Sequence, residues 1–116
     1  MIKITNIYND ILEISDISFQ KRAWLDKNES DCSSYVEVMC RLFDDNNFDS
    51  FVEQDAKKYG LDPKLISELK TLQEMLNNYE EKLTDSEIIQ DPNWMIIVNQ
   101  AKKVINFWNN LGSLGM

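Results

Sequence analysis

Asp45, Asn47 and Asp49 are spaced so that their side chains could ligate a calcium ion. Oxygen-bearing side chains at alternate positions fill the first three ligand positions of an EF-hand loop. The remainder of such a loop is missing, because Ser50 stands where the loop needs glycine and Ala56 stands where it needs a bidentate glutamate. The sequence therefore predicts no metal site at this position.

The groups that most enzymes use for catalysis are scarce in this chain. Histidine is absent, which excludes a Ser-His or Cys-His nucleophile pair. The three glycines are isolated from one another, so no glycine-rich loop is present to bind phosphate. Adjacent acids occur at Asp44–Asp45 and Glu80–Glu81, a pattern typical of a solvated surface. We predict a protein that is not an enzyme and that binds no cofactor.

Cys32 and Cys40 are the only cysteines. Two cysteines without histidine provide neither a disulfide framework nor a four-ligand zinc site. We expect two reduced thiols in a cytoplasmic protein, with Cys40 as a small buried apolar residue, and a bridge between the two as the alternative. The N-terminus, MIKITNIYND, lacks the continuous apolar segment of a secretory signal, and no run approaches the roughly 18 apolar residues of a membrane span.

The charges are distributed unevenly. The chain has a net charge of -8, and residues 26–55 alone, with nine acids and two bases, carry −7. Such a segment disfavours nucleic acid and anionic membranes and favours a basic protein partner. A solvated surface with capping acids is the alternative. The predicted partner-binding residues are the carboxylates Asp26, Glu29, Asp31, Asp44, Asp45, Asp49 and Glu53.

The elements that carry these carboxylates are predicted to be helices, because the chain is 43% apolar but has only three glycines and two prolines. Residues 1–25 hold isoleucines at helical spacing and form one helix, or two divided at Ser15–Asp16, with a short strand at Ile2–Ile4 as another possibility. Trp24 is expected to anchor the core, with an exposed binding role as the alternative. Residues 26–33 are polar and are expected to form a loop.

A capping box at Ser34 and Glu37 predicts the start of the next helix, which ends at Asp44–Asn47. Its apolar residues, Val36 and Cys40 among them, fall on two sides, which is typical of a central helix. A further amphipathic helix follows from Phe48 and ends at Gly60.

The second half of the chain shows the clearest periodicity. Residues 63–83 carry leucines in four-three alternation after an Asp62-Pro63 cap, and we interpret them as a core-facing helix rather than an intermolecular coiled coil. A capping box at Thr84 and Glu87 precedes a short helix, and Asp91-Pro92 begins the last one, to residue 111. The predicted fold is all-α: one compact domain over residues 1–116, with five or six helices, a C-terminal antiparallel helical hairpin and a flexible tail at about 112–116.

The run from Ser33 to Phe51, SSYVEVMCRLFDDNNFDSF, together with Phe19–Trp24, FQKRAW, resembles small acidic bacterial immunity proteins. These are the partners of contact-dependent growth-inhibition toxins and related toxins. The resemblance implies a cytoplasmic protein that binds and blocks one toxin domain, often a basic nuclease. The class shares no motif, so it implies no particular site residues.

We therefore predict a small acidic protein-binding module that occludes a basic partner, as an immunity protein or an antitoxin does. A monomer is favoured over a dimer. The alternative is a non-enzymatic helical subunit that self-associates, or acts as an adaptor, through residues 63–83 and 92–111.

Overall fold

The computed structural model of the protein describes residues 2–25 and 33–110. These residues form seven continuous helical segments and no strand, which confirms the all-α class but exceeds the predicted five or six helices. Two of the segments change their hydrogen-bonding pattern along their length. In chain order the elements are α1 (Ile2–Ile14), α2 (Ile17–Leu25), α3 (Tyr35–Met39) with η1 (Cys40–Asp45), α4 (Phe48–Ser50) with η2 (Phe51–Asp55) and α5 (Ala56–Lys58), α6 (Pro63–Asn78), α7 (Asp85–Gln90) and α8 (Pro92–Asn110).

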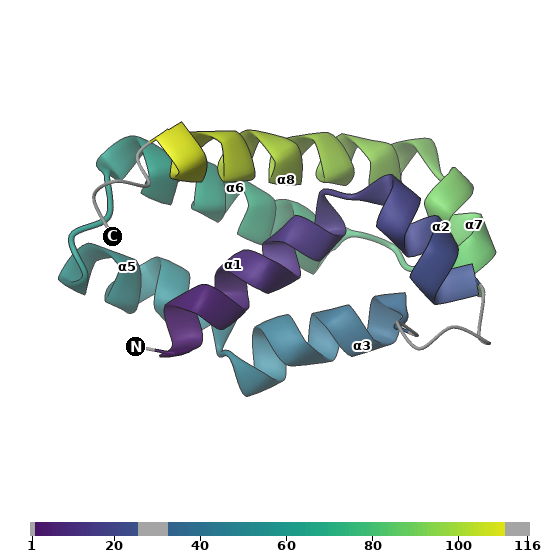
Figure 1. Ribbon diagram of the computed structural model, residues 1–116, viewed down its shortest axis with the longest axis horizontal. Coiled ribbons are helices and arrows are strands. Elements are labelled where there is room, and N and C mark those ends of the chain that lie inside the picture. Colours follow the sequence, from purple (N-terminus) through teal and green to yellow (C-terminus); the bar gives the residue numbers. More distant parts are fainter. Residues whose placement is uncertain (1, 26–32, 111–116) are drawn as a thin grey trace.

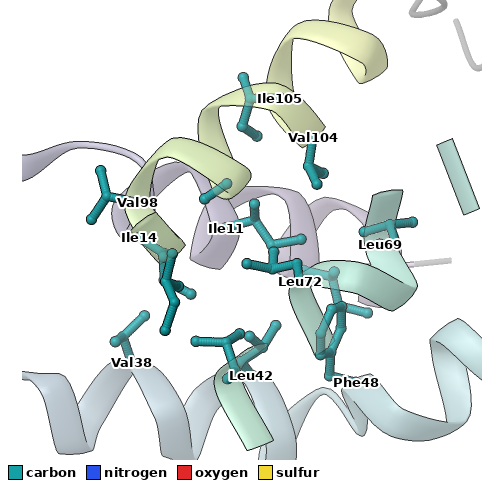
Figure 2. Close-up of a cluster of buried hydrophobic side chains, with 14 of the residues drawn as sticks. Ile11, Ile14, Val38, Leu42, Phe48, Leu69, Leu72, Val98, Val104 and Ile105 are labelled. Carbon is teal, nitrogen blue, oxygen red and sulfur yellow. The ribbon is translucent and has the colours of Figure 1, made fainter. Parts of the chain in front are cut away.

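Helices α6 and α8 lie side by side along the long axis of the molecule, and α1 also packs on α8 (Figure 1). Each helix buries one stripe of apolar side chains, as helical periodicity requires. These side chains meet in one core, where Ile11 and Ile14 of α1 lie near Leu42, Leu72 and residues of α8 (Figure 2). The core therefore joins the helices over residues 35–58, which carry the described part of the acidic segment 26–55, to the helices of the second half of the chain.

The helix boundaries follow the capping signals of the sequence. Asp62 accepts a hydrogen bond from the Lys64 backbone nitrogen, and Thr84 forms a complete capping box with Glu87. Gly60 has a φ of 77°, and the neighbouring backbone bonds close a Schellman motif after α5. At Ser34 the hydroxyl accepts from the Glu37 nitrogen, the first half of the predicted box.

The N-terminal region is two helices, so the strand alternative at its start is wrong. Asp16 separates them, since its Oδ1 accepts from the Phe19 nitrogen at 3.0 Å and caps α2. Trp24 is fully buried, which confirms it as a core residue and rules out the exposed role.

Three sequence predictions about residues with apolar or small side chains are wrong. The helix predicted over 63–83 ends at Asn78, and Leu83 is 96% exposed. Cys40 and Val36 are exposed although both were expected on a buried side. Leu111 and the tail 112–116 lie outside the described residues, as does Cys32.

Candidate protein-binding surface

The acidic segment is built on helices that depart from α-helical geometry. The backbone nitrogen of Asn46 donates to Arg41 O, five residues earlier, at 2.9 Å, which is the bond of a π-helix. A second π-helical stretch, η2, follows within the same region of the chain. Between them Asn47 adopts a left-handed conformation, with φ 51°, and turns the chain from one helix into the next. π-helical turns occur often at functional sites.

Four of the seven predicted partner-binding residues can be placed, and all four are exposed: Asp44, Asp45, Asp49 and Glu53. They lie within ten residues of chain, on both sides of Asn47. The other three, Asp26, Glu29 and Asp31, lie outside the described residues.

Asp49 and Glu53 are held together by a residue of the second half of the chain. Gln73 of α6 donates through Nε2 to Asp49 Oδ1 at 2.6 Å and to Glu53 Oε2 at 3.4 Å. A neutral amide orients both carboxylates without cancelling their charge. Gln73 falls between the leucines of the α6 stripe, and no sequence pattern predicts this role for it.

Arg41, the single cation of residues 33–55, has a side chain that is 39% exposed, and its ion pairs are with carboxylates of α1. Its Nε lies 3.1 Å from Asp10 Oδ1, and a second guanidinium nitrogen bonds Glu13 Oε1. Both acceptors belong to α1, and their side chains are 8% and 11% exposed. Arg41 thus neutralises carboxylates of α1 and leaves those of the surface unneutralised.

The carboxylates of Asp10 and Glu13 also accept hydrogen bonds from neutral donors. Asn46 donates through Nδ2 to Asp10 Oδ2 at 2.8 Å. Glu13 Oε2 accepts from Trp24 Nε1 at 3.0 Å and from Ser33 Oγ at 2.8 Å. We call the set Asp10, Glu13, Arg41 and Asn46 the closed cluster.

The closed cluster changes the ionisation of its members. Burial raises the pKa of the Asp10 carboxyl above its ordinary value of 3.8, and the hydrogen bond from Arg41 opposes that rise. Burial by itself lowers the pKa of Arg41, but the hydrogen bond to Asp10 and the charges of Glu13 and Asp10 together raise that pKa above its ordinary value. The spacing of Asp10 and Glu13 on one helix face was visible in the sequence, but their partner Arg41, 31 and 28 positions away from them, was not.

Within residues 2–25 and 33–110, no three acidic, cysteine or histidine side chains converge so that they could hold a metal ion. Over the same ranges, no helix combines the length and the apolar character needed to cross a bilayer.

Comparison with known proteins gave no relationship on which to base a function. No protein-family model matches the chain, and searches of curated proteins and of solved structures found no significant match.

Proposed function

We propose that this protein is a small cytoplasmic protein-binding module of a bacterium that inhibits a basic partner, in the manner of an immunity protein or an antitoxin. The proposed binding residues are Asp44, Asp45, Asp49 and Glu53, together with Asp26, Glu29 and Asp31 of the same acidic stretch of sequence. The protein acts by binding rather than by catalysis, and works as a monomer.

One observation carries the proposal: Asp44, Asp45, Asp49 and Glu53 are exposed, while the arginine of the same region forms its ion pairs with carboxylates of α1. A set of exposed charges of one sign attracts an oppositely charged partner and speeds its encounter. Gln73 adds to this, because it fixes two carboxylates in place before any partner arrives, which lowers the entropy lost on binding.

The mechanism we propose is occlusion. Arginine side chains of a partner's active cleft can each take two hydrogen bonds from one carboxylate, and such bonds are stronger than those between neutral groups. Once paired with Asp44, Asp45, Asp49 or Glu53, those arginines are withdrawn from the substrate of the partner.

The scaffold supports a monomer. The leucines that could have formed an intermolecular seam, Leu65, Leu69, Leu72 and Leu76, are between 0% and 5% exposed in the chain's own core. We propose that α6 and α8 form the antiparallel hairpin expected from their lengths and hold Gln73 beneath the surface.

The test uses the protein as bait. Wild-type protein and a variant with Asp44→Asn and Asp45→Asn are used to capture proteins from bacterial lysate at rising salt. We expect a basic protein that binds the wild type, whose affinity falls at least about tenfold in the variant and falls further with salt. The purified partner should lose activity when mixed with one equivalent of the wild type.

The matched control replaces two exposed acids elsewhere, Glu74→Gln and Glu81→Gln, and makes the same change in net charge. It should leave the affinity unchanged. If both variants bind the partner equally well, or if the partner binds without losing activity, the proposal is wrong.

A further inference from the structure

A cavity of about 330 Å³ opens on the surface where the C-terminal end of α6 meets the first turns of α8. Its apolar wall is formed by Met75, Ile96 and Ile97. Ile96 is 54% exposed, so part of this wall is in contact with solvent. The residues belong to parts of the chain other than those that carry the proposed partner-binding carboxylates.

The polar side of the cavity is organised around Asp91. Its Oδ2 accepts from the Tyr79 hydroxyl at 2.7 Å, and its Oδ1 accepts from the Asn93 backbone nitrogen at 3.0 Å. The hydrogen bond from Tyr79 holds the pKa of Asp91 below its ordinary value of 3.8, so the carboxylate is charged at neutral pH. A carboxylate has about four lone-pair positions, and these two bonds leave some of them available.

A cation of the chain already lies beside this carboxylate. Lys82 Nζ is 4.0 Å from Asp91 Oδ2, which is longer than a hydrogen bond, and the lysine side chain is 46% exposed. We call Tyr79, Lys82 and Asp91 the open cluster. The Asp91 side chain is only 7% exposed, but the ammonium of Lys82 is half-exposed and forms no hydrogen bond with it, so the ammonium can be displaced at low cost.

The charges around the cavity select the kind of ligand. Glu80 and Asp91 are negative and Lys82 is positive, so the lining carries one net negative charge. An anion would be repelled by two carboxylates. A cation gains their attraction, and Tyr79 adds an aromatic ring, to which cations are drawn within about 6 Å.

We propose that this cavity binds an alkylguanidinium or alkylammonium group. The aliphatic stem lies along Met75, Ile96 and Ile97, and the charged head takes the position of Lys82 beside Glu80 and Asp91. The site goes beyond the proposed function, because neither its residues nor its test depends on the acidic segment.

The test compares two probes of the same shape. N-acetyl-arginine methylamide carries a guanidinium, whereas the corresponding citrulline compound carries a neutral urea. Titration into the labelled protein, followed by NMR, should shift the amide signals of Tyr79, Asn93 and Ile96 with the arginine compound alone, with a dissociation constant in the millimolar range. Agmatine identifies the source of the ligand: if it binds and the blocked arginine does not, the ligand is a free amine and not a protein side chain.

Two lysine variants that change the net charge equally make the test specific. Lys82→Gln removes the competing ammonium and should tighten binding of the arginine compound about two- to fivefold. Lys70→Gln, an exposed lysine of α6 outside the cavity, should leave it unchanged. The proposal is overturned if the citrulline compound shifts the same signals as the arginine compound, if the shifts appear elsewhere, if neither the arginine compound nor agmatine causes a shift, or if the two lysine variants behave identically toward the probe that binds.

Discussion

The closed cluster and the open cluster both consist of a buried carboxylate with a cation beside it, but they differ in how the cation is held. In the closed cluster Arg41 bonds two carboxylates of α1 directly, and Asn46 takes a further acceptor position. In the open cluster the nearest partner of Asp91 is the neutral Tyr79 hydroxyl, and Lys82 remains 4.0 Å away. The first arrangement leaves little room for another cation and stabilises the fold. The second leaves its carboxylate accessible from a cavity.

The largest expected effect comes from Arg41→Met, which leaves Asp10 and Glu13 buried without their cation. We expect a loss of about 3 kcal/mol in the free energy of unfolding, measured by urea denaturation. The triple variant Asp10→Asn, Glu13→Gln, Arg41→Met removes all three charges and should recover most of that loss. An equal loss in the single and triple variants would show that the packing of the arginine side chain against α1, and not its charge, stabilises the fold.

The next effect concerns the buried hydrogen bond between Trp94 and Gln20. Gln20 donates to the carbonyls of Glu13 and Ile14, and its Oε1 accepts from Trp94 Nε1 at 2.9 Å in the core. Trp94→Phe leaves that oxygen buried and unsatisfied, so we expect a loss of about 2 kcal/mol in stability by urea denaturation.

The control for this variant is Tyr8→Phe, which removes an exposed hydrogen bond of 2.7 Å to Asn109. It should cost less than about 0.5 kcal/mol, because water replaces the lost partner. Similar losses in the two variants would contradict a specific role for the buried bond.

A smaller effect appears in the pH dependence of stability. Because the folded pKa of Asp91 lies below 3.8, its contribution to stability is present above 3.8 and is lost as the pH falls through the folded value. Tyr79→Phe removes the main cause of that lowered pKa. The variant should therefore lose less stability than the wild type between neutral pH and a pH below the folded value, as measured by urea unfolding at both.

An NMR titration of the Asp91 carboxyl carbon provides the direct check, and its midpoint should rise in Tyr79→Phe. An unchanged midpoint would mean that the hydroxyl does not stabilise the charged carboxylate.

The smallest effect is expected for Lys82→Gln in the absence of any ligand. Its urea unfolding midpoint should match that of the wild type within error, in contrast with Arg41→Met. A large loss would place Lys82 in a closed ion pair and remove the distinction between the clusters.

Much of the fold could be predicted because its signals are local. Caps at Asp62, Thr84 and Asp91 and the stop at Gly60 involve residues at most a few positions apart. The exposure of Cys40 could not be predicted, because the helix has apolar residues on two sides and periodicity does not show which side packs in the core. Val36 lies one turn before Cys40 and is exposed as well. Leu83 continued the leucine spacing of α6, but spacing alone does not show that the helix has ended at Asn78.

The candidate surface was predictable only as a concentration of charge. The exposure of Asp44 and Asp49 agrees with that prediction, since acids beside a turn tend to remain in water. The bond from Arg41 to Asp10 joins residues 31 positions apart in the chain, and the bond from Gln73 to Asp49 joins residues 24 positions apart. Such long-range pairings depend on how the helices pack.

The π-helical turns also affect how this protein can change in length. A π-helical turn accommodates one more residue between bonded groups than an α-helical turn does. Deleting one residue from Cys40–Asp45 should let that turn adopt α-helical bonding, with the helices on either side kept in place. A single-residue deletion, which would rotate one end of an ordinary helix by about 100° relative to the other, should here be absorbed within one turn. The acidic surface can therefore change the direction of its carboxylates by changes in length as well as by substitution, while the core beneath it stays the same.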